Sequence, residues 1–284
     1  MELGRLGIWW SGSWRDEGEV SIDVAAELEE LGYSALWSSG GFQPGLSTRF
    51  GRLLASTSRM AVASGIASIW LTSPEDLSRD VADLDARYPE RFLLGLGASH
   101  GPVVDNYNRP YSHMVGYLDG LDDAAVVTKD RRVLAALGPR MLTLAATRAR
   151  GAHPYFVPVE HTTRARATLG EGPLLAPEVT VVLESDPVRA RAVARTFTTG
   201  YLTLPNYANN LRSLGFGEDD VAGGGSDRLV DAVVAWGDIE TVAARVAAHY
   251  QAGADHVCIQ VVSDAKTSFP LAEYRRLAPA LLAL

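Results

Sequence analysis

The chain has 284 residues, 47% of them hydrophobic and 21% charged, with a formal net charge of -8 at pH 7. That length suits one (β/α)8 barrel, which typically needs ~250 residues, or two smaller domains. An acidic surface repels phosphate backbones and anionic lipids, so we expect neither nucleic acid nor a membrane as a partner.

The single cysteine, Cys258, excludes an internal disulfide and a cysteine-based zinc site. It lies in an apolar stretch, where a buried and unreactive thiol is expected. No apolar run is long enough to span a membrane, and the N-terminus lacks the basic start of a signal peptide. We therefore expect a cytoplasmic protein.

Short apolar runs alternate with amphipathic segments along the chain. Strands are expected at residues 6–10, 33–37, 60–69, 91–97, 132–137, 155–157, 179–183 and 256–262. Helices are expected at residues 19–31, around 50–54, from 74, at 114–126, from 139, at 160–169, after 187 and at 241–250. Eight alternations predict an α/β protein, a (β/α)8 TIM barrel formed as one domain over residues 1–284. The long segment between the seventh and eighth strands is expected to hold barrel helices and a helical insertion.

Small and polar residues follow several of the predicted strands. In RFLLGLGASH, residues 91–100, Gly95 and Gly97 let another backbone or a flat ligand come close, and His100 ends the stretch. After the fifth strand, Gly138 opens a helix beside Arg140, which exposes backbone N–H groups to an anion. Ordinary packing explains each segment taken alone. All of them, however, follow the carboxyl ends of parallel strands, where barrel enzymes bind ligands.

Aromatic residues near the first three strand ends can form a substrate pocket, although core packing is expected for at least one of the tryptophans. The candidates are Trp9, Trp10, Trp37 and Trp70, together with the serines Ser38 and Ser39. No metal site is predicted, because His113 and His153 lack the ligand spacing to another histidine or a carboxylate. Both histidines are expected to be structural.

Five segments occur in a characteristic order: GIASIWLTSPEDLSRDVADLD, RFLLGLGASHGP, YNRPYSHMVGYLDGLD, ALGPRMLTLAATRARGAHPYFVP and AGADHVCIQVV. Together they resemble the luciferase-like monooxygenase superfamily, and more narrowly its actinobacterial branch that uses the deazaflavin coenzyme F420. The resemblance implies a flavin or deazaflavin ring lying across the mouth formed by the carboxyl ends of the strands. It also implies a non-prolyl cis peptide bond under the ring, at the position matched by Ala67–Ser68.

The resemblance further implies roles for individual residues. His100 falls where related deazaflavin dehydrogenases carry an acid thought to supply a proton, and imidazole titrates near the working pH. The residues matched to the coenzyme, F420 or alternatively FMN, are Ala67, Ser68, Ile69, Gly97, Ala98, Ser99, Ala136, Leu137, Gly138, Pro139, Arg140, Val157, His161, Thr162 and Arg164.

One departure affects the expected reaction. Ser38 and Ser39 stand where many relatives carry an acidic residue followed by histidine, and a serine hydroxyl is a poor base near neutral pH. The alcohol oxidation of the sugar-phosphate dehydrogenases is therefore disfavoured. We predict hydride transfer between F420 and a small or medium organic substrate. The alternatives are an FMN-dependent monooxygenase fed by a separate reductase, and a coenzyme-binding barrel without catalysis. Family members often form homodimers, but no segment identifies such a face.

Overall fold

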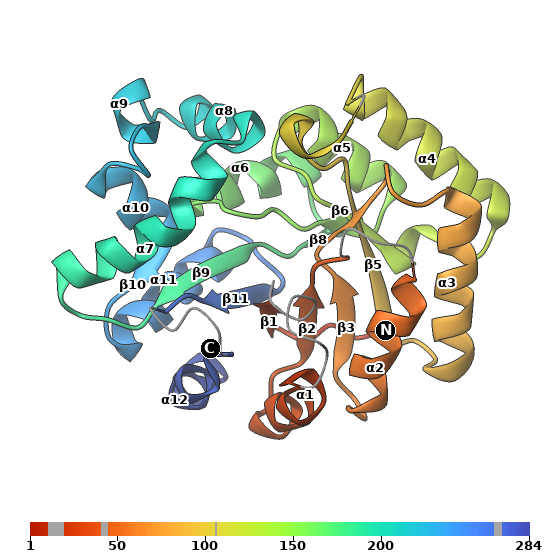
Figure 1. Ribbon diagram of the computed structural model, residues 1–284, viewed down its shortest axis with the longest axis horizontal. Coiled ribbons are helices and arrows are strands. Elements are labelled where there is room, and N and C mark those ends of the chain that lie inside the picture. Colours follow the sequence, from red (N-terminus) through yellow and green to blue (C-terminus); the bar gives the residue numbers. More distant parts are fainter. Residues whose placement is uncertain (11–19, 41–44, 106, 264–268) are drawn as a thin grey trace.

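A curled parallel sheet forms the centre of the protein, and helices cover its outer face (Figure 1). The computed structural model describes residues 1–10, 20–40, 45–105, 107–263 and 269–284. The strands are β1 (Leu6–Trp10), β2 (Ala35–Ser38), β3 (Ala61–Ser64), β4 (Ala67–Ser68), β5 (Phe92–Gly97), β6 (Arg132–Leu134), β7 (Gly151–Ala152), β8 (Leu174–Leu175), β9 (Glu178–Val182), β10 (Val234–Trp236) and β11 (Val257–Val261). Their hydrogen-bonded order is β10-β9-β11-β1-β2-β3-β5-β6-β7-β8, with β4 paired to β5 outside this path. The predicted α/β class with a parallel sheet is confirmed.

The helices alternate with these strands along most of the chain. They are α1 (Val20–Leu31), α2 (Leu46–Ala55), α3 (Pro74–Arg87), α4 (Pro110–Ala124), α5 (Pro139–Arg148), α6 (Val159–Leu169), α7 (Pro187–Leu202), α8 (Pro205–Ser213), α9 (Glu218–Val221), α10 (Asp227–Val233), α11 (Ile239–Gln251) and α12 (Leu271–Leu281). Among the residues described, no helix combines the length and apolarity that crossing a membrane requires.

One end of the sheet, at β7 and β8, meets β9 through the segment that joins β8 to β9, and β10 pairs with β9 farther along the chain. The backbone amides of Ala176 and Glu178 donate hydrogen bonds of 2.9 Å to the carbonyl oxygens of Ala152 and Pro154, beyond the end of β7. The other edge of β9 pairs in parallel with β11, which in turn pairs with β1. These bonds extend the curl of the sheet.

Alternate residues of the strands face the interior of the curl and the helices outside. Small side chains such as Ala35 and Ala63 share the interior cluster with Trp37, whose side chain is fully buried. Trp37 therefore fills the core and does not line a substrate pocket, as was expected for at least one tryptophan. Its indole N–H donates to Nε2 of His256 at 3.0 Å.

Two predicted strands differ from the observed ones, and some observed strands were not predicted. The predicted strand at 60–69 is divided into β3 and β4 around a cis peptide bond between Gly65 and Ile66. The predicted strand at 155–157 is not a strand, because Phe156 has a left-handed φ of 57° and its amide donates to the Glu178 carboxylate at 3.2 Å. The strand β10 was not predicted, since its three residues follow α10 without a turn signal.

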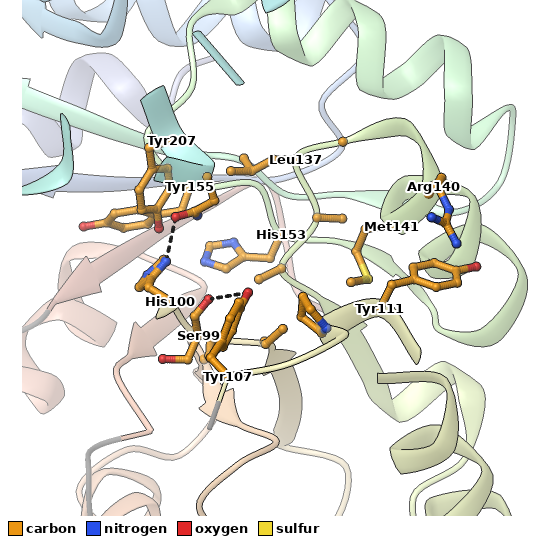
Figure 2. Close-up of a pocket in the computed structure, with 18 of the residues that line it drawn as sticks. Ser99, His100, Tyr107, Tyr111, Leu137, Arg140, Met141, His153, Tyr155 and Tyr207 are labelled. Atoms are coloured by element: carbon orange, nitrogen blue, oxygen red, sulfur yellow. Dashed lines mark hydrogen bonds between the residues drawn. The ribbon is translucent and has the colours of Figure 1, made fainter. Parts of the chain in front are cut away.

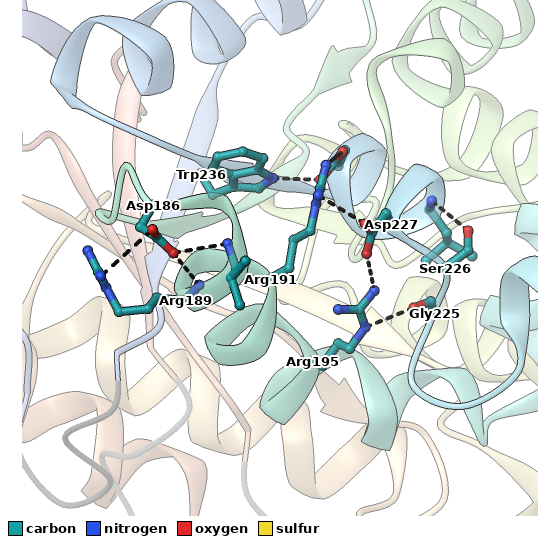
Figure 3. A network of polar contacts seen from close by, with 11 residues as sticks. Asp186, Arg189, Arg191, Arg195, Gly225, Ser226, Asp227 and Trp236 are labelled. Carbon is teal, nitrogen blue, oxygen red and sulfur yellow. Dashed lines mark hydrogen bonds and ion pairs between the residues drawn. The ribbon is translucent and has the colours of Figure 1, made fainter.

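The segment between β9 and β11 contains α7 to α10, strand β10 and α11. Polar contacts connect α7 to the end of α10 and to β10 (Figure 3). The guanidinium of Arg191 donates to both oxygens of the Asp231 carboxylate at 2.9 and 2.6 Å, and the Trp236 indole donates to the same carboxylate at 2.7 Å. Burial opposes the charge of Asp231, but these donors outweigh it and lower the pKa of the carboxyl.

We expect Asp231→Asn to lower the free energy of unfolding by about 1–2 kcal/mol, because it removes the charge that accepts all three hydrogen bonds. Urea unfolding measures this change. Asp219→Asn is the matched control, since Asp219 is exposed, and its effect is expected to stay within ~0.5 kcal/mol. Equal stabilities of the two variants would contradict a structural role for the Asp231 contacts.

Candidate functional site

A cavity with two compartments opens at the carboxyl ends of the strands. The first compartment has a volume of about 430 Å³ and the second a volume of about 400 Å³. Residues from five separate stretches of the chain line both of them: Ile66, Ser99, His100, Ala135, His153, Tyr155 and Tyr207. The two compartments therefore adjoin along this shared wall, so that ligands bound in each of them would be neighbours.

The floor of the cavity is formed at the break between β3 and β4. The cis peptide bond lies at Gly65–Ile66, so the expected position at Ala67–Ser68 was wrong by two residues. The Ile66 side chain occupies the space beside Gly97, where an added Cβ would lie 2.5 Å from Cδ1 of Ile66. At Gly95 an added Cβ would lie 2.0 Å from the Ser64 carbonyl oxygen. The glycines of β5 thus admit a neighbouring backbone and the Ile66 side chain.

Many of the residues predicted to bind a coenzyme or substrate line the cavity. Those in the first compartment are Gly97, Ala98, Ser99, His100, Ala136, Leu137, Gly138, Pro139 and Arg140. Those in the second are Trp9, Ser39, Ser68, Ser99 and His100. The structure thus brings together residues from five predicted strand ends.

Other predicted residues lie outside both compartments. Ala67, Ile69, Val157 and Thr162 are buried in packing, and Ser38 is buried with its hydroxyl donating to the Trp10 carbonyl. Trp10 packs edge-on against Phe269. Trp70 donates to the Ala98 carbonyl at 2.7 Å and stacks on His113, consistent with the structural role expected for that histidine. Arg164 donates to Ser213 at 2.9 Å.

One end of the first compartment is suited to an anion. Helix α5 begins there at Pro139 after Gly138, and the amides of Arg140 and Met141 belong to its first turn, which has no intrahelical acceptors for them. The Arg140 guanidinium lies 4.2 Å from the centre of the Tyr111 ring. His161 supports this loop from behind, since its Nε2 lies 2.9 Å from the Leu137 carbonyl oxygen. His161 is itself buried, so it positions the loop without lining the cavity.

His100 lies where the compartments meet, facing Tyr207 (Figure 2). Its Nδ1 lies 2.8 Å from Oδ1 of Asn206, an acceptor, so Nδ1 carries the proton and Nε2 has a free lone pair when the ring is neutral. Burial lowers the pKa of His100 below 6.5, although the Asn206 hydrogen bond acts in the opposite direction. The ring is therefore neutral at pH 7 and able to take up a proton.

Several lining residues were not predicted from the sequence. Asn206 and Tyr207 come from α8, in a segment that contains no motif, and both line the first compartment. Tyr155 was assigned to a strand, yet its hydroxyl lies 2.7 Å from Gln260 and 2.9 Å from the Tyr201 hydroxyl at the cavity wall. His153 was expected to be structural, and it also lines both compartments.

The cavity carries little charge. Among the described residues that line either compartment, Arg140 is the one with a formal charge, and the rest are apolar, aromatic or neutral polar side chains. The described part of the chain also contains no cluster of three or more histidine, cysteine or acidic side chains able to hold a metal ion. The arrangement fits a mostly neutral, flat ligand with one anionic end.

Comparisons with known proteins show which proteins this chain resembles. Residues 18–129 match the model of the luciferase-like monooxygenase family. No curated protein sequence matches the chain. An F420-dependent secondary alcohol dehydrogenase, solved with an F420–acetone adduct, has a similar structure, with 13% identity, a TM-score of 0.75 and 99% of each chain covered.

Two further solved structures share the fold. The coenzyme F420-dependent tetrahydromethanopterin reductase of Methanopyrus kandleri gives 14% identity and a TM-score of 0.71, with 99% of each chain covered. The oxygenating constituent of 3,6-diketocamphane monooxygenase of Pseudomonas putida, solved with FMN, gives 14% identity and a TM-score of 0.70, covering 98% of this chain and 96% of that one. The resemblance to the luciferase-like monooxygenases seen in the sequence is confirmed over residues 18–129, where the family model matches.

Proposed function

We propose that this chain is one barrel-shaped oxidoreductase unit that transfers a hydride between F420 and a small or medium organic substrate. The observation that carries the proposal is the cavity at the strand ends, in which an anion-binding end opens into a neutral, aromatic interior. Two of the similar structures are named as F420-dependent enzymes, which supports this coenzyme.

The first compartment fits the coenzyme. The free amides at the start of α5 and the Arg140 guanidinium are donors of the kind that hold a phosphate group. A Cβ built on Gly138 would meet no atom within 4 Å, so the backbone is open to a ligand there. Farther in, Ile66 and Gly97 offer an apolar surface to a planar ring.

The second compartment would then take the substrate, next to the coenzyme ring. A bound deazaflavin would supply the hydride chemistry, and the protein would supply orientation and exclusion of water. His100 moves the accompanying proton at its Nε2, because its Nδ1 is occupied by Asn206. Tyr155 and Tyr207 cover the junction and keep water away from it.

A second candidate function is that of an FMN-dependent monooxygenase fed by a separate reductase. The similar structure solved with FMN favours it, and the same phosphate-binding end suits either coenzyme. The third candidate is a coenzyme-binding barrel without catalysis. Ser39 lines the cavity after β2, at a place where many relatives carry an acidic residue followed by histidine, and a serine hydroxyl is a poor base. Titration of the purified protein with F420 and with FMN, followed by ring absorbance, distinguishes the first two candidates. Coenzyme binding without turnover over a broad substrate panel would identify the third. Failure to bind either ring at micromolar concentration would contradict all three.

We expect Arg140→Gln to weaken coenzyme binding about tenfold, because the guanidinium is the one charged group that the described residues offer to the phosphate. The matched control is Arg164→Gln. Arg164 contacts Ser213 outside the cavity, so its loss is expected to change the dissociation constant less than twofold. Fluorescence titration of both variants measures these values. A larger effect at Arg164 would place the phosphate elsewhere.

A further inference from the structure

His153 lines both compartments and carries a buried hydrogen-bond acceptor that is not used within the protein. Its Nδ1 lies 2.7 Å from the carbonyl oxygen of Ala176, which can only accept, so Nδ1 carries the proton. Nε2 therefore has a lone pair, and it has no hydrogen-bond partner among the described residues. Burial lowers the pKa of His153 to about 4, which keeps the ring neutral and Nε2 an acceptor at pH 7.

The His153 ring cannot rotate to bring Nε2 to a partner within the protein. It stacks on Trp37 with 4.2 Å between the ring centres and an angle of 15° between the planes. The residue is 1% exposed, and the Ala176 contact fixes its orientation. Figure 2 shows the imidazole in the middle of the lining residues, between His100 and Met141. Since buried polar groups in native proteins are generally paired, a ligand donor is the natural partner of this nitrogen.

A second unpartnered atom has the opposite polarity. The indole N–H of Trp9 is buried and also has no acceptor among the described residues. Trp9 lines the second compartment, as His153 does, and its ring lies 4.8 Å from that of Tyr155. Two residues that line this compartment therefore carry one unpaired acceptor and one unpaired donor, and the described residues of its wall include no charged side chain.

We propose that the second compartment selects a neutral, planar ligand that donates an N–H or O–H hydrogen bond to Nε2 of His153 and accepts one from Trp9. A cyclic amide, or lactam, presents both groups on one edge and is the ligand class that fits. A site built to pair with a ligand N–H rejects analogues that lack it, because its own buried atom is then left unpaired. This inference rests on the proposed function, in which the second compartment holds the substrate.

Quinolin-2(1H)-one and its N-methyl derivative are suitable probes, since they share a shape and a carbonyl group and differ in the N–H donor. Their dissociation constants are measured by calorimetry with F420-loaded protein, and F420 affinity is measured separately. The wild-type protein is expected to bind the N–H compound at least tenfold more tightly. Equal affinities, or no binding of either compound, would overturn the proposal.

Two substitutions of His153 distinguish the loss of the Nε2 acceptor from a general loss of structure. Asparagine can keep the donor to Ala176 but cannot place an acceptor at the position of Nε2, so His153→Asn is expected to abolish the preference. Glutamine can place its amide oxygen there, so His153→Gln is expected to restore part of it. Trp9→Phe should weaken both probes equally, because both keep the carbonyl. A preference unchanged in His153→Asn would overturn the role of Nε2.

The coenzyme titration distinguishes a failure of the proposed F420-dependent function from a failure of the proposed ligand class. F420 affinity is measured for every variant, because His153 lines the coenzyme compartment as well as the second one. If His153→Asn weakens F420 and leaves probe discrimination intact, His153 contacts the coenzyme and the substrate inference is wrong. If the wild-type protein does not bind F420 but still discriminates between the probes when free of coenzyme, the proposed function is wrong and the ligand class stands.

Discussion

Replacing His100 by alanine is expected to lower the turnover number about 100-fold or more, while the affinity for the coenzyme changes by less than a few-fold. A positioned proton donor or acceptor contributes a rate factor of roughly this size. The imidazole lies at the junction of the two compartments, where it can reach a substrate next to the coenzyme ring. Steady-state kinetics with the identified substrate, together with a coenzyme titration, measures both quantities.

The matched control is His113→Ala. His113 stacks on Trp70 and contacts the Ile69 carbonyl, and it does not line either compartment. Its loss is expected to leave the turnover number within about twofold, apart from any loss of folded protein. If the two alanine variants have the same turnover, His100 has no part in proton transfer.

The pH profile gives an independent test with a defined sign. Burial lowers the pKa of His100 below 6.5, so the neutral ring persists to lower pH than in a free imidazole. When the substrate loses a hydride, His100 accepts the proton, and kcat/KM should fall as the pH drops below the lowered pKa. When the substrate gains a hydride, the protonated ring is needed and the rate should rise over the same range. Asn206→Ala removes a contact that raises this pKa, so the pH at which the rate changes should be still lower in this variant, whichever direction the change takes.

Local pattern was sufficient to predict most of the strand–helix units. Each strand is buried on both faces, so it appears in the sequence as a short apolar run between turn residues. Helix starts were equally local. The hydroxyl of Ser73 accepts from the Asp76 amide at 3.1 Å, as the Ser-Pro-Glu-Asp sequence indicates. Contacts made within a few residues in sequence thus determine where these elements begin.

Features that depend on distant residues could not be predicted in this way. The third apolar run is divided at Gly65 in the folded protein, where an added Cβ would lie 2.3 Å from Nε1 of Trp9. The turn at Phe156 depends on the Glu178 carboxylate, which lies 22 residues later. In both cases the partner comes from another strand, and nothing in the local sequence indicates the contact.

The same distinction applies to the cavity. The segments with glycine and small residues after β5 and β6 line it as the sequence suggested, because carboxyl ends of parallel strands meet at one edge. His100 was identified, but its partner Asn206 was not, since the two residues are separated by 106 positions. His153 was interpreted by metal-ligand spacing alone. Its unpaired nitrogen becomes visible only when the contacts of both ring nitrogens are known.

The second large effect is expected on stability in acid, through His256. Its Nδ1 lies 2.9 Å from the Gly4 carbonyl oxygen and its Nε2 accepts the Trp37 N–H at 3.0 Å, so the ring is held neutral in the interior. Burial lowers the pKa of His256 from 6.5 to about 4. A difference of that size corresponds to about 3 kcal/mol of stability, present above pH 6.5 and lost as the pH falls through 4.

A variant that lacks the His256 imidazole isolates the contribution of this histidine to the pH dependence of stability. Glu178 has the opposite pH dependence, because burial raises the pKa of its carboxyl from 4.5 to about 7. The stability that Glu178 contributes is present below pH 4.5 and is lost as the pH rises through 7. Comparing wild type with His256→Gln cancels the effect of Glu178, which both proteins contain. The variant is expected to be less stable at pH 7, and the gap in unfolding free energy should shrink by about 3 kcal/mol between pH 7 and pH 4. Urea unfolding at several pH values measures the gap, and a gap that is constant with pH would show that His256 is not held neutral by the fold.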